Sequence, residues 1–269
     1  MSYNSNTPMA PAPYMVFIMK LPFKTIFLII VGLVFSHAVN SQEPLKIAHS
    51  NQGGPWAWKE QGLYKGLIVD IANEALSNRM NLEISHHLFP WKRAQHSVRT
   101  GAMDALITNY TEERKQYTIA SSELITNIRR SIFVKKNNPI IPKLKDVQYL
   151  RQLTGYSMGN YSGNGWAEKN LTDMQVTWGN SSISVLKMLS HNRFDIYIAN
   201  PISTRFKLKN HGINNIVMLP NEILDIKPSR FRLLIRKDSE YTEILPRFDE
   251  VIKNMKKEGT LQKIINKYQ

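Results

Sequence analysis

One pattern occurs twice in this chain, at a constant offset of 91 residues, and it constrains the fold more than any other feature. Each copy has an apolar helical stripe, a turn residue, an aspartate and a short apolar strand, in residues 94–107 and again in 185–198. Asp104 of the first copy corresponds to Asp195 of the second. A duplicated helix–turn–strand unit predicts two α/β lobes built on the same plan. A chance resemblance between two α/β segments is the alternative.

A second, shorter echo places a basic strand after each copy, at 132–136 and at 233–237. We therefore expect the chain to leave the first lobe near Lys135 and to return to it near Arg230. The first lobe would comprise residues 42–135 and 230–269, and the second lobe residues 136–229. Because strands alternate with helices, we expect each lobe to be a mostly parallel sheet flanked by helices.

Hydrophobic periodicity and turn residues place the individual elements. Short apolar runs predict strands at 45–49, 82–87, 104–109, 131–136, 155–159, 175–178, 194–199, 216–219 and 231–236. Amphipathic runs predict helices at 69–78, 162–170, 182–191, 201–209, 241–256 and 261–267.

The polar loop after the first copy carries an arginine toward an expected ligand edge. Trp91, Ala94 and Val98 form one face of a helix, which a glycine can end. Residues 104–109 are mostly apolar, as in a strand covered on both faces. Arg114 follows at the carboxyl end of that strand, where open α/β sheets bind their ligands.

The charge pattern and the absence of cysteine exclude several classes of protein. The formal charge is +14, from 35 basic and 21 acidic residues, yet Lys and Arg are spread along the chain. We expect a diffuse basic surface and no nucleic-acid partner. Without cysteine, disulfides and thiolate sites are excluded. The seven histidines show no ligand spacing, so no metal and no other cofactor is expected, and no catalytic motif is present.

The first 41 residues predict an export signal. Two lysines precede an apolar run at 26–35, and small or polar residues follow. This is the order of a secretory signal, with cleavage after Ala38 or after Ser41. Residues 1–18 would be an extension upstream of a start at Met19, unless the chain starts at Met1. The run is short for a membrane span, so the cleaved chain is expected outside the cytoplasm and without a span.

A series of ordered motifs makes the chain resemble a known family. The motifs are Pro55-Trp56 followed by Trp58, Gly66 with Asp70, Trp91 before Asp104, Thr111-Glu-Glu-Arg-Lys115, Phe133-Val-Lys-Lys136, Gly155 with Gly159, Phe194-Asp195, Pro201, and the ending from Glu258 to Tyr268. In these motifs the chain is similar to the periplasmic solute-binding proteins of ABC importers, in the polar-amino-acid group (bacterial extracellular solute-binding family 3). The resemblance covers the chain after the signal region. It implies a periplasmic, two-lobed, type II periplasmic-binding-protein fold with two hinge strands.

The resemblance also implies a function and a clamp. A small polar or carboxylate-bearing ligand would be captured between the lobes by hinge closure and delivered to an ABC permease. In the family, the arginine at the position of Arg114 clamps the α-carboxylate of the ligand, and a guanidinium can meet a carboxylate with two hydrogen bonds. Asn109 stands where the family has a Thr or Ser that contacts the ligand. The alternative is a surface arginine paired with Glu112 or Glu113.

Further ligand-binding residues follow from the same resemblance. The family packs an aromatic residue on the ligand, which Trp56 or Trp58 matches, with a surface or core role as the alternative. Asn160, Tyr161 and Ser162 are expected at a helix N-terminus that presents backbone N–H groups to an anion. Simple helix capping is the alternative there.

Two departures from the family pattern bear on the ligand. Family members that bind amino acids hold the α-ammonium with acidic residues, which align here with Ser50 and Asn200. A neutral site cannot offset the desolvation of an ammonium as a carboxylate would. We therefore expect a carboxylate, a neutral or aromatic compound or a peptide fragment rather than an ordinary α-amino acid.

Two other functions compete with transport. The fold also carries cyclohexadienyl dehydratases, but such an enzyme needs a poised acid in the cleft. Glu112, Glu113 and Glu168 are expected instead to cap helices or face solvent, so no enzyme is predicted. A sensory ligand-binding protein is the third reading, and it would need a separate signalling partner.

Overall fold

The computed structural model describes residues 43–51 and 54–269. The predicted signal region and its cleavage sites lie outside these ranges. Within them, no helix is both long enough and apolar enough to cross a membrane.

The first lobe is built on a six-stranded sheet with the order β4-β1-β5-β13-β6, and β7 also pairs with β13. Its strands are β1 (Leu45–Ser50), β4 (Ile84–Phe89), β5 (Ala105–Asn109), β6 (Thr118–Ala120), β7 (Thr126–Ile128) and β13 (Ser229–Arg236). The strand β1 runs parallel to β4 and β5. The strand β13 runs antiparallel to β5, β6 and β7.

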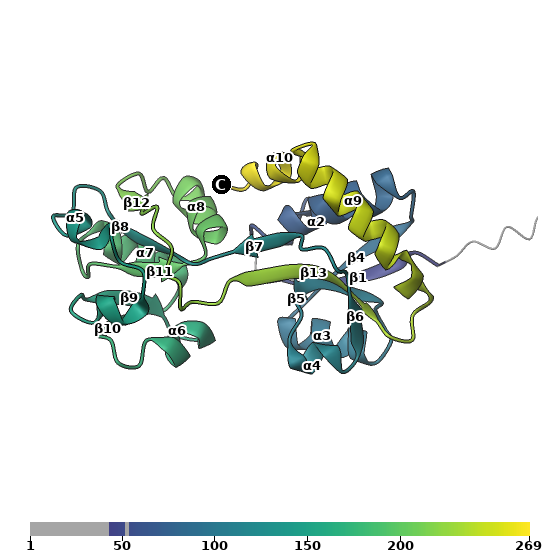
Figure 1. Cartoon of the computed structure of the whole chain (residues 1–269), viewed down its shortest axis with the longest axis horizontal. Helices are drawn as coiled ribbons and strands as arrows, with labels where there is room; N and C mark the ends of the chain where they lie inside the picture. Colours follow the sequence, from purple (N-terminus) through teal and green to yellow (C-terminus); the bar gives the residue numbers. More distant parts are fainter. Residues whose placement is uncertain (1–42, 52–53) are drawn as a thin grey trace, which may run out of the picture. The chain divides into compact units, whose positions relative to one another are not determined.

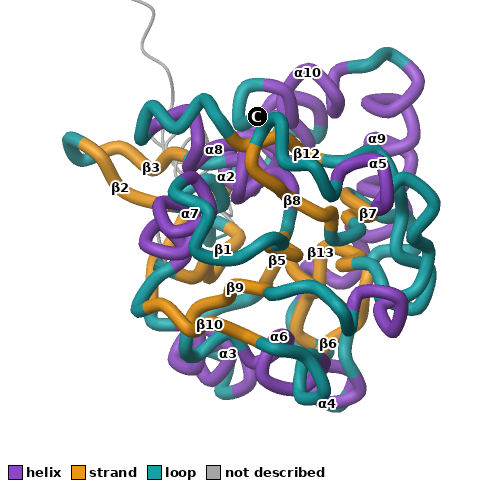
Figure 2. The backbone as a smooth tube through the Cα atoms, turned by 90° about the vertical axis from the view of Figure 1, so that its left-hand side faces the viewer, coloured by secondary structure: helices purple, strands orange, loops and turns teal. Residues whose placement is uncertain are grey.

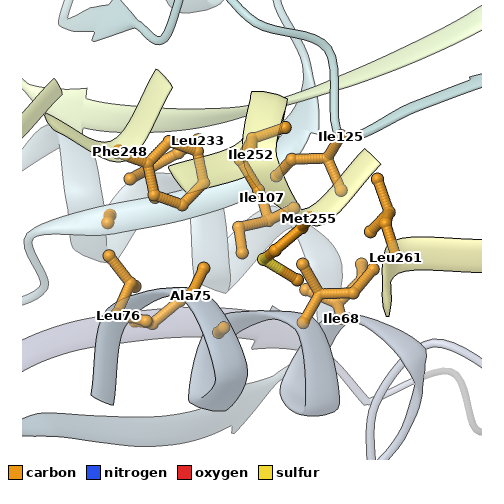
Figure 3. Close-up of a cluster of buried hydrophobic side chains, with 14 of the residues drawn as sticks. Ile68, Ala75, Leu76, Ile107, Ile125, Leu233, Phe248, Ile252, Met255 and Leu261 are labelled. Carbon is orange, nitrogen blue, oxygen red and sulfur yellow. The ribbon is translucent and has the colours of Figure 1, made fainter. Parts of the chain in front are cut away.

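Successive residues of these strands alternate between two apolar layers. On one face, Ile47 and Leu233 pack with α2, η1, α9 and α10, while on the other Ala48 and Leu234 pack with α3. The helical elements are α2 (Leu67–Ala72), η1 (Asn73–Arg79), α3 (Trp91–Arg99), α4 (Glu112–Lys115), η3 (Glu240–Ile244), α9 (Leu245–Lys257) and α10 (Thr260–Asn266). Figure 1 shows α2 and α9 on one side of the sheet and α3 and α4 on the other. Figure 3 shows side chains of α9 meeting those of α2 and η1 in the first layer.

The second lobe contains a three-stranded and a two-stranded sheet. The strands are β8 (Ser131–Lys135), β11 (Tyr197–Ala199) and β12 (Ile216–Met218) in one, and β9 (Met158–Tyr161) and β10 (Val176–Gly179) in the other. Met158 bridges to Ile196 in parallel and links the two sheets. The helical elements are α5 (Ile141–Leu144), η2 (Leu150–Leu153), α6 (Gly165–Asn170), α7 (Ser182–Ser190) and α8 (Pro201–Asn210). Figure 2 shows β9 beside β10, and also the hairpin of β2 (Trp58–Glu60) and β3 (Leu63–Lys65) of the first lobe.

The structure explains the repeated aspartate. The Asp104 carboxylate accepts a hydrogen bond from the Lys46 N–H at 3.0 Å, and the Asp195 carboxylate accepts one from the Ser157 N–H at 3.1 Å. In return, the N–H of each aspartate donates to the carbonyl of the same partner. In each copy the turn residue has a positive φ, +85° at Gly101 and +56° at Asn192. The repeat is therefore a common device that fixes a helix–turn–strand unit to a neighbouring segment, at Lys46 in β1 and at Ser157 just before β9.

Several boundaries differ from expectation. The strand β8, expected in the first lobe, pairs with β11 and β12, so we move the proposed first crossing to the residues between β7 and β8. This three-stranded sheet is antiparallel rather than parallel. The helix expected over 69–78 starts at Leu67 and becomes π-helical from Asn73. The helix expected over 241–256 begins as a 3-10 turn, and α9 starts where Pro246 can occupy a first-turn position that needs no N–H.

Candidate functional site

A large cavity of about 550 Å³ lies where residues of the two lobes meet. This volume is in the range of small-molecule sites, roughly 300–1,000 Å³. The first-lobe side is formed by Gly54, Trp56, Asn109 and Phe231. The second-lobe side is formed mainly by polar residues around β9 and the N-termini of α7 and α8, including Tyr161, Asn164, Ser181, Ser182, Asn200, Ser203 and Lys207, with Arg130 at the crossing.

A small cavity of about 170 Å³ lies in the first lobe. Trp56 and Phe231 line both cavities, and their rings are 5.1 Å apart. The other lining residues are mostly apolar or aromatic: Ala48, His49, Ser50, Ala57, Ile68, Trp91, Ile107 and Thr108. The small first-lobe cavity is therefore mostly apolar, whereas the second-lobe side of the large cavity is mostly polar.

The structure separates the two candidate tryptophans. The Trp56 Nε1–H donates to Ser203 Oγ at 3.0 Å, which ties the loop after β1 to α8. Trp58 begins β2 instead, and its ring packs on Phe206 and Tyr268 at 5.8 and 6.1 Å. Of the two, only Trp56 lines either cavity.

Arg114 lies in the short helix α4, and its guanidinium is held by neutral groups. The Nε–H and Nη2–H donate to Gln95 Oε1 at 3.1 and 2.9 Å, and an Nη1–H donates to the Asn109 carbonyl at 2.9 Å. The cation stacks on Trp91, 5.0 Å from the ring centre. Thr111 caps the helix by accepting the Arg114 N–H. Helix, cap and ring together fix the direction of the guanidinium before any ligand arrives.

The expected surface alternative for Arg114 is wrong. Its side chain is buried, with 9% of the residue exposed. Glu112 pairs with Lys115 at 2.5 Å and Glu113 with Arg99 at 2.7 Å. Burial lowers the pKa of Arg114, and the nearby Tyr117 and Glu113 offset part of that shift.

Arg114 itself lines neither cavity, but its partners do. Asn109 lines the large cavity, and Trp91 lines the small one. The Asn109 side chain is engaged as well, because its Oδ1 accepts the Arg230 N–H at 2.7 Å. The guanidinium therefore lies one residue away from both cavities.

Ser50 and Asn200, the positions without the expected acids, lie on different cavities. Ser50 lines the small cavity, and its buried Oγ has no hydrogen-bond partner among the described residues. Asn200 lines the large cavity and caps α8 by accepting the Ser203 N–H at 3.2 Å. Neither position offers a carboxylate to an ammonium.

The prediction of a helix N-terminus at Asn160–Ser162 is wrong. The helix α6 begins only at Gly165, because the Ser162 N–H donates to the Gly179 carbonyl as β9 ends. The Tyr161 N–H donates to Asn160 Oδ1 at 3.0 Å. Tyr161 lines the large cavity, whereas Asn160 is fully buried and neither Asn160 nor Ser162 lines it.

Two cations of the large cavity were not predicted from the sequence. Arg130 stacks on Trp166 with its guanidinium 4.2 Å from the ring centre. Lys207 donates from Nζ to Ser182 Oγ at 2.5 Å. The only sequence signal for Lys207 is its helical spacing from Ser203 on α8. Arg130 follows another arginine between two strands and gives no such signal.

The comparisons with known proteins agree with this geometry. Residues 45–269 match the family described as bacterial extracellular solute-binding proteins, family 3. The chain is similar to the probable amino-acid-binding protein YxeM of Bacillus subtilis (strain 168), with 22% identity over 232 residues that cover 83% of each chain.

Solved structures show the same fold. One is substrate-binding domain 2 of GlnP from Lactococcus lactis in an open conformation, with a TM-score of 0.67, 16% identity, and coverage of 85% of this chain and 96% of that one. Another is a histidine kinase sensor domain with similarity to periplasmic binding proteins, with a TM-score of 0.60, 17% identity, and coverage of 85% and 97%. The fold is that of a type II periplasmic binding protein. The family match covers most of the chain, and the protein therefore belongs to the bacterial extracellular solute-binding proteins, family 3.

Proposed function

We propose that this protein captures a small carboxylate-bearing ligand between its two lobes in the periplasm and delivers it to an ABC permease. Hinge closure would trap the ligand, and the permease would recognise the closed form. The large cavity supports this proposal because both lobes contribute to its wall. The protein would act by binding rather than by catalysis, and neither cavity is lined by an aspartate or glutamate that could serve as an acid.

The single observation that carries the proposal is the buried, preorganised guanidinium of Arg114. Gln95 and Asn109 fix its orientation with neutral acceptors, and Trp91 covers one face. A buried cation with no directly paired carboxylate is costly, and a bound carboxylate would lower that cost. These hydrogen bonds do not use all the N–H groups of the guanidinium, so a ligand can accept from the remainder.

The class of ligand follows from the same charges. The relative YxeM is named as a probable amino-acid-binding protein, and every amino acid has a carboxylate. However, Ser50 and Asn200 are neutral, so an α-ammonium would lose its water without gaining a counterion. We therefore propose a carboxylate ligand without an ordinary α-amino group.

A thermal-shift screen of residues 42–269 tests the proposal. The screen compares organic acids, aromatic acids, short peptides and the standard amino acids. A ligand at 100 times its Kd should stabilise the fold by about 2.7 kcal/mol. Micromolar binding of standard amino acids would contradict the proposed ligand class, and absence of any carboxylate ligand would contradict the capture function.

The Arg114→Gln variant tests the clamp with the ligand found in that screen. We expect its affinity to fall by about 1.5–3 kcal/mol, the value of a hydrogen bond to a charged group. The control is Arg99→Gln, because Arg99 pairs with the exposed Glu113 and should not affect binding. Circular dichroism of the ligand-free variants shows whether they fold. Unchanged affinity in a folded Arg114→Gln variant would remove Arg114 from the site.

A further inference from the structure

Arg130 is a cation of the large cavity that pairs with no carboxylate among the described residues. It lies between β7 and β8, where the chain passes from the first lobe to the second. Its neighbour Arg129, in contrast, forms an ion pair with Glu222 at 3.2 Å. Trp166 covers one face of the Arg130 guanidinium at 4.2 Å. Stacking leaves the in-plane N–H groups available, and the structure describes no hydrogen bond that uses them.

Lys207 is the second such cation. It lies on the same face of α8 as Ser203, and both line the large cavity. Its Nζ donates to Ser182 Oγ at 2.5 Å, which uses one of its three N–H groups. Burial lowers the pKa of Lys207, as expected for an ammonium removed from water without a described carboxylate partner.

The wall around these cations offers no compensating charge. The lining residues of the large cavity include Arg130 and Lys207 but no aspartate or glutamate. A neighbouring acid, Glu168, is exposed and accepts the Gly163 N–H at 2.7 Å. The hydroxyls and amides that complete the wall are neutral. The second-lobe side of the described cavity therefore has a net positive charge that a ligand can balance.

We propose that the ligand has a second anionic group, which Arg130 and Lys207 hold on the second-lobe side of the large cavity. The inference rests on the proposed function, in which Arg114 takes the first carboxylate. The two groups would be bound by different lobes, so the same ligand bridges them. Trp56 and Phe231 line both cavities, so an apolar spacer of the ligand would lie against these two rings. The ligand class is a dicarboxylate, or a carboxylate with a phosphate, joined by a short apolar spacer.

Calorimetric titration with matched probes tests the second anion site. The dicarboxylates succinate, glutarate and adipate cover three spacer lengths, and 3-phosphonopropionate tests a phosphorus anion. Glutaramate is the matched control, because it replaces one carboxylate of glutarate by a neutral amide of the same shape. We expect the best dianion to bind about ten- to a hundredfold more tightly than its monoamide, the effect of losing one charged hydrogen-bonding group.

The variants Arg130→Gln and Lys207→Gln assign this difference to the two cations. We expect each to weaken the dianion by about tenfold or more and to leave the monoamide nearly unchanged. The controls are Arg129→Gln, which lies beside Arg130 but pairs with Glu222, and Lys209→Gln, which is exposed on α8. Both controls should keep the discrimination between dianion and monoamide.

The outcomes separate this inference from the proposed function. If a monoanion binds as tightly as the best dianion through Arg114, or if both cavity variants keep full discrimination, the second anion site is refuted and the capture of a carboxylate stands. If no carboxylate binds at all, the proposed function fails and this inference fails with it.

Discussion

At the residue scale, two histidines meet beside the small cavity: His49 is buried and lines the cavity, and His86 is half-buried. The His49 Nε2 and His86 Nδ1 are 2.8 Å apart, and the His86 Nε2 is 2.9 Å from Asn73 Oδ1. An amide oxygen only accepts, so His86 donates to Asn73 and accepts from His49, with both rings neutral. Burial, followed by the charge of neighbouring histidines, lowers the pKa of His49 to about 3 and that of His86 to about 4.

This pair predicts a loss of stability in mild acid. Below the ordinary histidine pKa of about 6.5, these two histidines bind protons in the unfolded chain. In the folded chain they stay neutral until the pH falls to about 4 for His86 and about 3 for His49. Between pH 7 and pH 5, His49 alone should reduce the free energy of unfolding by about 2 kcal/mol. Urea unfolding of the wild type and of the double variant His49→Phe/His86→Leu measures this, since the apolar pair has nothing to titrate. The exposed His211→Gln serves as the control, and equal pH slopes for wild type and double variant would contradict the assignment.

Individual residues of the candidate site differ in how far the sequence could predict them. Arg114 was singled out by its position after a strand and by its motif, and its role in ligand binding stays a prediction. Its partner Gln95 was not, because the contact joins the side chains of two helices whose packing the sequence does not display. Arg130 was not predictable either, since its proposed role depends on Glu222 pairing with Arg129 and not with Arg130.

At the element scale, Gly159 lets β9 approach the strand of the second aspartate copy. A Cβ at Gly159 would lie 2.0 Å from the ring of Phe194, which is buried. We expect Gly159→Ala to lower the free energy of unfolding by about 1–3 kcal/mol, because the ring or the strand must move. Gly155→Ala is the matched control: its Cβ would meet nothing within 4 Å, so the change should stay within about 0.5 kcal/mol.

Denaturant unfolding of both variants tests this packing. A third variant, Gly159→Ala with Phe194→Leu, should lose less than the sum of the two single changes, because the smaller side chain makes room. Strict additivity would show that Gly159 and Phe194 do not constrain each other.

The sequence predicted helices and strands correctly where a local pattern determines them, and its predictions were wrong where the pairing of distant strands determines the structure. The repeat placed α3, β5, α7 and β11 correctly, because periodicity and turn residues are local signals. The partners of β8 were misplaced, because the apolar run Ser131–Lys135 fits either sheet equally well. Its true partners depend on where the chain crosses between lobes, which no local pattern records.

At the scale of the whole molecule, contacts outside the cavities already join the lobes. Arg205 of α8 donates to the side chain of Gln269 at 2.7 Å, and Phe206 packs on Tyr268. These contacts and the Trp56–Ser203 hydrogen bond place α8 against the first lobe. The proposed closure would therefore rearrange the cavity wall around α8 while the chain bends at the two proposed crossings.

A ligand that bridges the lobes should make the protein more compact in solution. Small-angle scattering is expected to show a smaller radius of gyration when the best dianion is added at saturating concentration, because the ligand stabilises only the conformation that reaches both its ends. The Arg130→Gln variant loses a contact to one end of the ligand, so its radius of gyration should decrease less at the same ligand saturation. The Arg129→Gln variant should become as compact as the wild type. Binding without any compaction in the wild type would contradict capture by hinge closure, even if the affinity is high. Equal compaction in the Arg130→Gln variant would instead show that closure depends on other contacts, such as those of Trp56 with α8.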